Sequence, residues 1–189
     1  MKHLHLLIIS ISILFIQCKK EDTEATYEVT FDINWNAEDF PIKYPSNPHF
    51  SKIIGWSHSS SNDFFALGSM ASEGIKEMAE LGSTEPLNEE IDNKIKNKEG
   101  YDLVVGDNLG SGVGKITVEV NVNKENPSVT LSTMLAPSPD WYLAAVNINL
   151  LENEEFVDEK IVTALMYDAG TDSGTDYIYS KQITDPKQP

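Results

Sequence analysis

The sequence alternates between apolar and polar residues, and this pattern constrains the fold more than any other feature. Every second residue is apolar over residues 116–122, and the same period of two returns over residues 129–135. A third alternating stretch, residues 27–35, lies near the start and is rich in aromatic residues. A period of two places successive side chains on opposite faces of a strand. The pattern therefore predicts strands with one face buried.

Two further apolar stretches, residues 141–150 and 156–166, are separated by a polar turn at residues 152–155. We expect them to pair as an antiparallel hairpin. Together with the three alternating stretches and further short apolar segments, they predict seven or eight short strands separated by turn signals. This organisation is typical of an all-β fold, an antiparallel β-sandwich.

Two short helices are expected as insertions beside the sheets. Residues 73–81 place apolar side chains on one helical face, with Ser72 as the N-cap and Gly82 as the stop. We expect the second helix over residues 85–98, because Leu87, Ile91 and Ile95 recur at intervals of four. Neither helix carries a pair of residues that suits catalysis.

The first residues resemble an export signal. A basic start precedes an apolar run at residues 6–16, which is too short to span a membrane. The only cysteine, Cys18, follows this run at the place where bacterial lipoproteins carry their lipid. A plain secretory signal with an incidental cysteine is the alternative. The expected organisation is a signal peptide (1–17), lipidated Cys18 with a tether (18–26), one domain (27–184) and a tail (185–189).

This organisation predicts a protein anchored by lipid at a bacterial outer membrane or cell surface, with no other membrane contact. If Cys18 carries lipid, no cysteine remains for a disulfide or a thiolate metal site. The charge is strongly negative, because 14 lysines and no arginine face 30 Asp and Glu residues, for a net charge of −16. Nucleic acid is excluded as a partner, since it needs cationic contacts. Solubility and calcium buffering both remain as reasons for the acidic excess.

Two acidic segments lie at the two ends of the expected hairpin. Asp140 directly precedes its first strand, and Asp168 and Asp172 follow its second strand. In an antiparallel hairpin these residues come to the same end of the sheet. Calcium is the cation that best suits carboxylates on flexible, glycine-bearing loops. Asp176 is a candidate for an additional ligand.

Other accounts of the acidic segments are weaker or remain open. An EF-hand beginning at Asp168 is excluded, because Tyr179 stands where that loop needs a bidentate glutamate. An acidic turn without metal is the open alternative, since aspartate and glycine are ordinary turn residues.

Several motifs occur in the order and approximate spacing of a known family. They are residues 27–31 with Trp35, 40–41, 48–51, 57–58, 67–74, 79–82, the PSPDW of residues 137–141 and the DAGTDSG of residues 168–174. The chain resembles the spondin N-terminal domain family over nearly its whole length after the signal. The resemblance implies a β-sandwich similar to calcium- and lipid-binding domains of the C-two type. It also implies that calcium binds to Asp140, Asp168 and Asp172.

The resemblance further implies a role in adhesion or recognition, with a surface polysaccharide or matrix protein as partner. We expect a monomer and no enzymatic activity. The chain departs from the animal members of the family in lacking their disulfide cysteines, so a particular receptor is not carried over. A metal-assisted polysaccharide hydrolase and a purely structural surface protein are the alternatives.

Overall fold

The structure, a computed structural model, describes residues 23–59 and 66–189. The expected signal peptide and Cys18 lie outside these residues. In chain order the elements are β1 (Glu24–Asn34), β2 (His49–Phe50), β3 (Ile54–His58), α1 (Glu73–Leu81), α2 (Leu87–Lys96), β4 (Gly100–Val105), β5 (Val113–Asn123), β6 (Ser128–Ala136), β7 (Trp141–Asn149), β8 (Leu151–Glu152), β9 (Glu155–Phe156) and β10 (Leu165–Asp168). Of the helices in the described ranges, none is long and apolar enough to cross a membrane.

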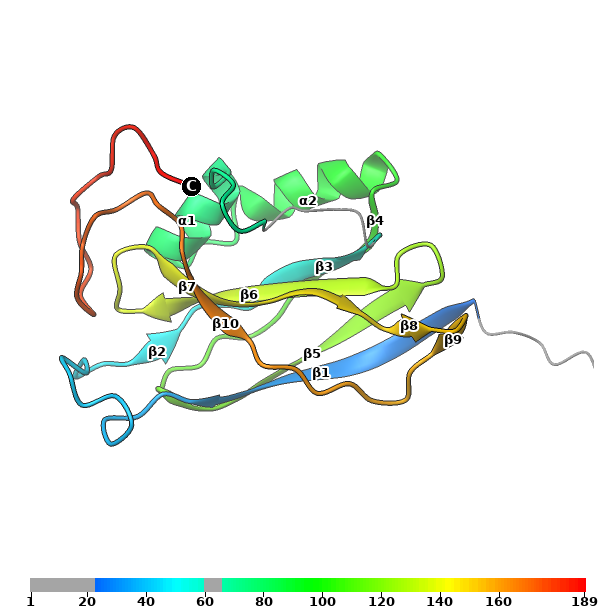
Figure 1. The fold of residues 1–189 in the computed structure, drawn as a ribbon, viewed down its shortest axis with the longest axis horizontal. Coiled ribbons are helices and arrows are strands. Elements are labelled where there is room, and N and C mark those ends of the chain that lie inside the picture. Colours follow the sequence, from blue (N-terminus) through cyan, green and yellow to red (C-terminus); the bar gives the residue numbers. More distant parts are fainter. Residues whose placement is uncertain (1–22, 60–65) are drawn as a thin grey trace, which may run out of the picture.

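Two antiparallel sheets form a sandwich, as the alternation predicts (Figure 1). One sheet consists of β1 and β5, which pair along the whole length of β1. The other has the strand order β10-β7-β6-β3-β4, and β2 attaches to β6. The inner faces meet in an apolar core in which Phe31, Val120 and Leu131 are buried. The predicted all-β antiparallel sandwich is confirmed. β1 begins at Glu24, earlier than the expected start of the domain.

The two helices cover the outer face of the larger sheet (Figure 1). Met78 of α1 and Ile91 of α2 are fully buried in a second apolar cluster that also contains Trp56 of β3. As a result, all nine residues of β6 are buried, although the alternation predicted one exposed face. Three of its polar side chains, those of Thr130, Ser132 and Thr133, find partners; the Ser132 hydroxyl, for example, donates to the Ile54 carbonyl at 3.2 Å. The buried hydroxyl of Ser128 has none among the described residues. Buried hydroxyls need such partners to avoid the cost of desolvation.

The first helix has the predicted bounds. The Ser72 hydroxyl accepts from the Ile75 amide at 3.1 Å, and Gly82 ends the helix in the left-handed region at φ 65°. The second helix is shorter than the predicted residues 85–98. Pro86 is its N-cap rather than an internal residue, and it forms no side-chain cap. Lys98 takes a positive φ of 64°, which is incompatible with continuing the helix.

The prediction that residues 156–166 form the second strand of the hairpin is wrong over most of that range. After β7 the chain forms the small hairpin of β8 and β9, and it then runs through residues 157–164 without pairing with either sheet. Three successive charged residues, 158–160, interrupt the apolar alternation there. Only β10 returns to β7, and its register places Asp168 opposite Trp141. The end of the hairpin that carries the acidic segments therefore forms as predicted.

Candidate metal centre

A tight turn between β6 and β7 holds Asp140 inside the protein. The Ser138 hydroxyl donates to the Leu135 carbonyl at 2.5 Å and accepts from the Trp141 amide at 3.2 Å. Both Ser138 and Asp140 are fully buried. The turn is thus closed by its own serine, and it places a carboxylate at the end of the larger sheet.

The two oxygens of Asp140 have different surroundings. Oδ2 accepts from the amides of Thr171 and Asp172, at 2.7 and 3.0 Å, and from the Thr171 hydroxyl at 3.2 Å. Oδ1 is buried and has no hydrogen-bond partner among the residues that the structure describes. A buried carboxylate oxygen without a donor or cation is costly. Oδ1 is therefore an atom that a cation would satisfy.

Burial raises the pKa of Asp140 above its ordinary value, and the nearby Asp168 carboxylate adds to the rise. The amides of Asp172 and Thr171 oppose it without cancelling it. Between the ordinary and the raised pKa, the metal-free folded protein binds more protons than the unfolded chain. Its free energy of unfolding therefore falls as the pH rises through that window. A cation beside the carboxylate would favour the charged form and counteract this loss.

Asp168 is the last residue of β10 and lies beside the turn of Asp140. Its Oδ2 accepts from the Trp141 indole at 3.1 Å, and its Oδ1 accepts from the Gly170 amide at 2.8 Å. Gly170 has a φ of 67°, the conformation that glycine adopts at least cost. Asp168 is exposed, so this carboxylate faces solvent while that of Asp140 does not.

Asp172 orders the next part of the loop. Its Oδ1 accepts from the Gly174 amide at 2.8 Å, and its Oδ2 accepts from the Gln182 amide at 3.0 Å. The side chain is buried, and its own amide donates to Asp140. The structure therefore brings Asp140, Asp168 and Asp172 into one loop cluster.

Asp176 does not join this cluster through its carboxylate, which forms an ion pair with Lys43. No set of three or more His, Cys, Asp or Glu side chains in residues 23–59 and 66–189 is arranged so that it could hold a metal ion. The carboxylates as placed would need oxygens from the backbone or from water to complete a calcium site.

Sequence reasoning missed the residues that hold the carboxylates in place. Ser138 could have been found, because a serine between two prolines favours a local turn bond. Thr171 gives no such signal, since its contact with Asp140 joins residues 31 apart in sequence. Trp141 was counted as a strand residue, whereas its indole also donates to Asp168.

Comparison with known proteins identifies the family. The family described as Spondin_N matches residues 25–189, which include both acidic segments. The chain is 34% identical to mouse Spondin-1 over 173 residues, covering 87% of this chain and 21% of that protein, and the values for human Spondin-1 are the same. It is 28% identical to human Spondin-2 over 154 residues, covering 79% of this chain and 46% of that protein. The chain thus spans about a fifth of Spondin-1 and less than half of Spondin-2. It belongs to the Spondin_N family.

Proposed function

We propose that this protein is a calcium-binding, extracytoplasmic module that adheres to, or recognises, a surface polysaccharide or a matrix protein. The observation that carries the calcium proposal is the buried, unpartnered Oδ1 of Asp140 beside the Asp168 carboxylate. Membership of the Spondin_N family supports the role in adhesion or recognition.

Calcium suits the donors that the loops offer. It accepts six to eight oxygens, and it tolerates mixtures of carboxylates, carbonyls and water. Asp140, Asp168 and Asp172 would hold the ion once their side chains turn toward one point, since these carboxylates are not gathered around a common centre in the structure. Oxygens of the loop backbone and of water would complete its shell. The ion would supply positive charge, which offsets the repulsion between Asp140 and Asp168 and satisfies Oδ1. The loops would then be ordered more firmly for contact with a partner.

The anchor is the second part of the proposal. Lipid on Cys18 would hold the domain at a bacterial outer membrane or cell surface, and the segment up to β1 would serve as the tether. The domain itself would act as a monomer that projects from the membrane. In this arrangement the calcium loops are available to a ligand outside the cell.

The proposal is tested on an array of surface polysaccharides and matrix proteins, probed with the protein in calcium and in chelator. We expect binding to at least one class in calcium and a loss of at least tenfold in chelator. Asp140→Asn should lose the calcium-dependent part, because it removes the charge of the buried ligand. Asp92→Asn, an exposed residue of α2, is the matched control and should bind like the natural chain.

Two results would contradict the proposal. An array without any binder would favour a purely structural surface protein, and the adhesive role would be abandoned. Turnover of a polysaccharide by the pure protein, lost in Asp140→Asn, would show a hydrolase instead.

A further inference from the structure

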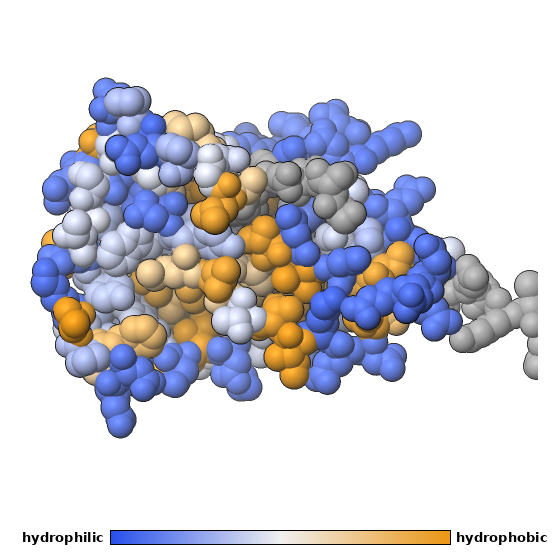
Figure 2. All heavy atoms as spheres, viewed as in Figure 1, coloured by the Kyte–Doolittle hydropathy of each residue, from blue (hydrophilic) through white to orange (hydrophobic). Residues whose placement is uncertain are grey.

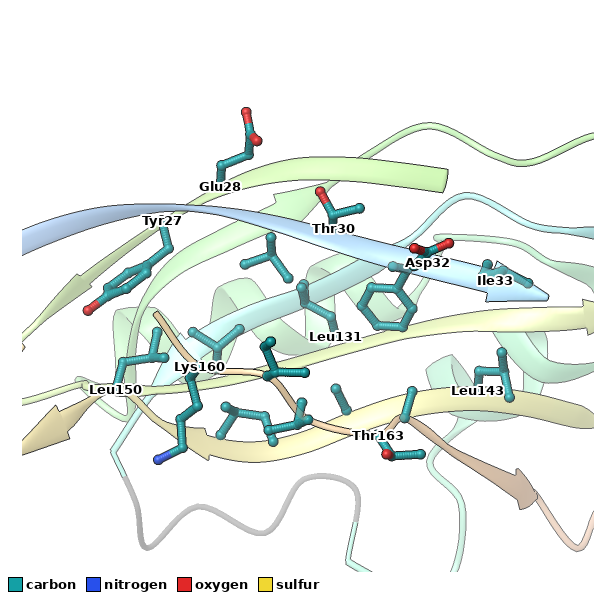
Figure 3. A pocket seen from close by; sticks show the side chains of 18 of the residues that line it. Tyr27, Glu28, Thr30, Asp32, Ile33, Leu131, Leu143, Leu150, Lys160 and Thr163 are labelled. Carbon is teal, nitrogen blue, oxygen red and sulfur yellow. The ribbon is translucent and has the colours of Figure 1, made fainter. Parts of the chain in front are cut away.

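A large cavity lies between the two sheets, separate from the aspartate cluster. Its volume is about 1470 Å³. Figure 3 shows Tyr27 pointing from β1 into this space, while Leu143 and Leu150 approach it from the opposite wall. Protein interiors are close-packed and leave few voids larger than a water molecule. Pockets for small molecules usually measure about 300–1,000 Å³, so this cavity has room for a larger occupant.

The edge of β1 forms one wall of the cavity. Every residue from Glu24 to Trp35 lines it, although the inner face of a strand offers only every second residue. The edge of the backbone must therefore border the cavity as well. Within the described ranges, the backbone of β1 pairs only with β5, so its other edge is open over a strand of 11 residues. An open edge of this length is a template for another strand.

The segment of residues 157–164 borders the other side of the cavity. It pairs with neither sheet, and its Ile161 is 87% exposed. Leu165 and Met166, which follow it in β10, are more than half exposed. Figure 2 shows apolar side chains gathered on this face of the molecule, over β10 and its surroundings. The space between β1 and this segment is thus apolar, and among the described residues the edge of β1 that faces it is unpaired. On the segment's side, Val157 is bonded: its amide donates to the Leu150 carbonyl at 3.0 Å, and its carbonyl accepts from the Tyr27 hydroxyl at 2.6 Å. A strand entering here would take the place of the Tyr27 contact.

We propose that this space binds an extended, basic polypeptide strand of another protein. Backbone hydrogen bonds to the open edge of β1 would hold the strand, and every second side chain, being apolar, would enter the cavity. A lipid chain could fill the cavity, but it would leave the edge of β1 without partners. The two observations together therefore favour a polypeptide.

The charges around the cavity indicate which kind of polypeptide strand would bind there. Five acidic residues border the cavity: Glu24, Glu28, Asp32, Asp158 and Glu159. The side chains of the first three lie on the outer face of β1, beside its open edge, and that of Asp32 already binds Lys115 at 2.8 Å. The ammonium group of Lys160, which also borders the cavity, binds the Glu152 carboxylate at 3.0 Å and the Asn149 carbonyl at 2.9 Å. A lysine-rich strand complements this lining. A second copy of the chain, at a net charge of −16, would be repelled.

The probe for this site is a labelled peptide of 11 residues in which valine and lysine alternate. We expect the protein to bind it. Exchange of the β1 amides that face away from β5 should be fast in the free protein and slower with the peptide. Lysine amides and valine amides face opposite edges of an extended peptide. N-methylation of the set that faces β1 should weaken binding at least tenfold, whereas methylation of the other set should weaken it much less.

A matched pair of variants tests the role of charge. Glu28 of β1 and Glu119 of β5 lie directly opposite each other, so reversing either charge removes the same repulsion. Of the two, only Glu28 belongs to the strand whose edge borders the cavity, and its side chain points away from the interior, beside that edge (Figure 3). Glu28→Lys should weaken binding of the lysine peptide by about threefold to tenfold at low salt, and Glu119→Lys should weaken it less.

Several outcomes would overturn the proposal. Slow exchange along the open edge of β1 in the free protein would show that the edge is already paired. Equal binding of both N-methylated peptides, or full competition by the neutral detergent octyl glucoside, would show an apolar site for lipids. Peptide binding should persist in chelator and in Asp140→Asn, so the failure of the calcium proposal would leave it intact.

Discussion

Asp140→Ala is expected to lower the free energy of unfolding by about 3 kcal/mol in chelator, before any calcium binds. The alanine removes the acceptor of the Thr171 amide, the Thr171 hydroxyl and the Asp172 amide, all in a buried loop. Each buried donor without an acceptor costs about 1–3 kcal/mol. Relief of the repulsion from Asp168 offsets part of this sum.

Urea unfolding of the chelated protein measures this cost. Asp140→Asn is the matched comparison, because its amide oxygen can still accept from Thr171 and Asp172 while its charge is gone. We expect the asparagine to cost about 1.5 kcal/mol less than the alanine, or a larger difference still. Equal costs would contradict the view that the acceptor, rather than the charge, holds the loop in the metal-free protein.

Gly55→Ala is expected to be comparably damaging, because of close contact between strands. Gly55 lies in β3 between β4 and β6, and a Cβ there would stand 2.0 Å from the Thr130 carbonyl oxygen and 2.8 Å from the Leu131 Cα. Both atoms belong to the backbone of β6, so the central strands would have to separate. Overpacking of this kind costs about 1–3 kcal/mol or more.

The thermal midpoint of Gly55→Ala should fall by roughly 6–12 °C if the cost is about 3 kcal/mol. Gly110→Ala is the matched control, since a Cβ at that position would meet nothing within 4 Å. We expect that variant to melt within about 2 °C of the natural chain. A tolerated alanine at position 55 would contradict the described approach of β3 to β6.

The sandwich was predictable because alternation depends on the period of a strand rather than on remote contacts. The first helix was predictable as well, since Ser72 and Gly82 act on their own neighbours in sequence. The burial of the outer face of β6 was not predictable. The helices that cover this face, α1 and α2, come from earlier in the chain, and the sequence of the strand does not indicate that they pack against it. Residues 157–164 were misassigned, because their apolar content outweighed the charges that keep them from pairing.

The aspartate cluster was predictable in place but not in detail. The return of the chain to β7 sets Asp168 opposite Trp141, and this local register suffices to bring Asp140 and Asp168 together. The two Asp140 oxygens differ because the amides of Thr171 and Asp172 both donate to Oδ2 and neither donates to Oδ1. These contacts join residues far apart in sequence, so the local register does not predict them. The open edge of β1 follows from where residues 157–164 fail to pair, which the sequence alone did not indicate.

The most direct test of the calcium site is the melting midpoint of the natural chain and of Asp140→Asn, each in 10 mM calcium and in chelator. Extracellular calcium modules bind with dissociation constants of about 10⁻⁴–10⁻³ M, so calcium should stabilise the natural chain by about 1.4–2.7 kcal/mol. That gain corresponds to a rise of roughly 3–10 °C, and Asp140→Asn should show almost none of it. An unchanged midpoint of the natural chain, or an equal rise in Asp140→Asn, would contradict a calcium site at Asp140.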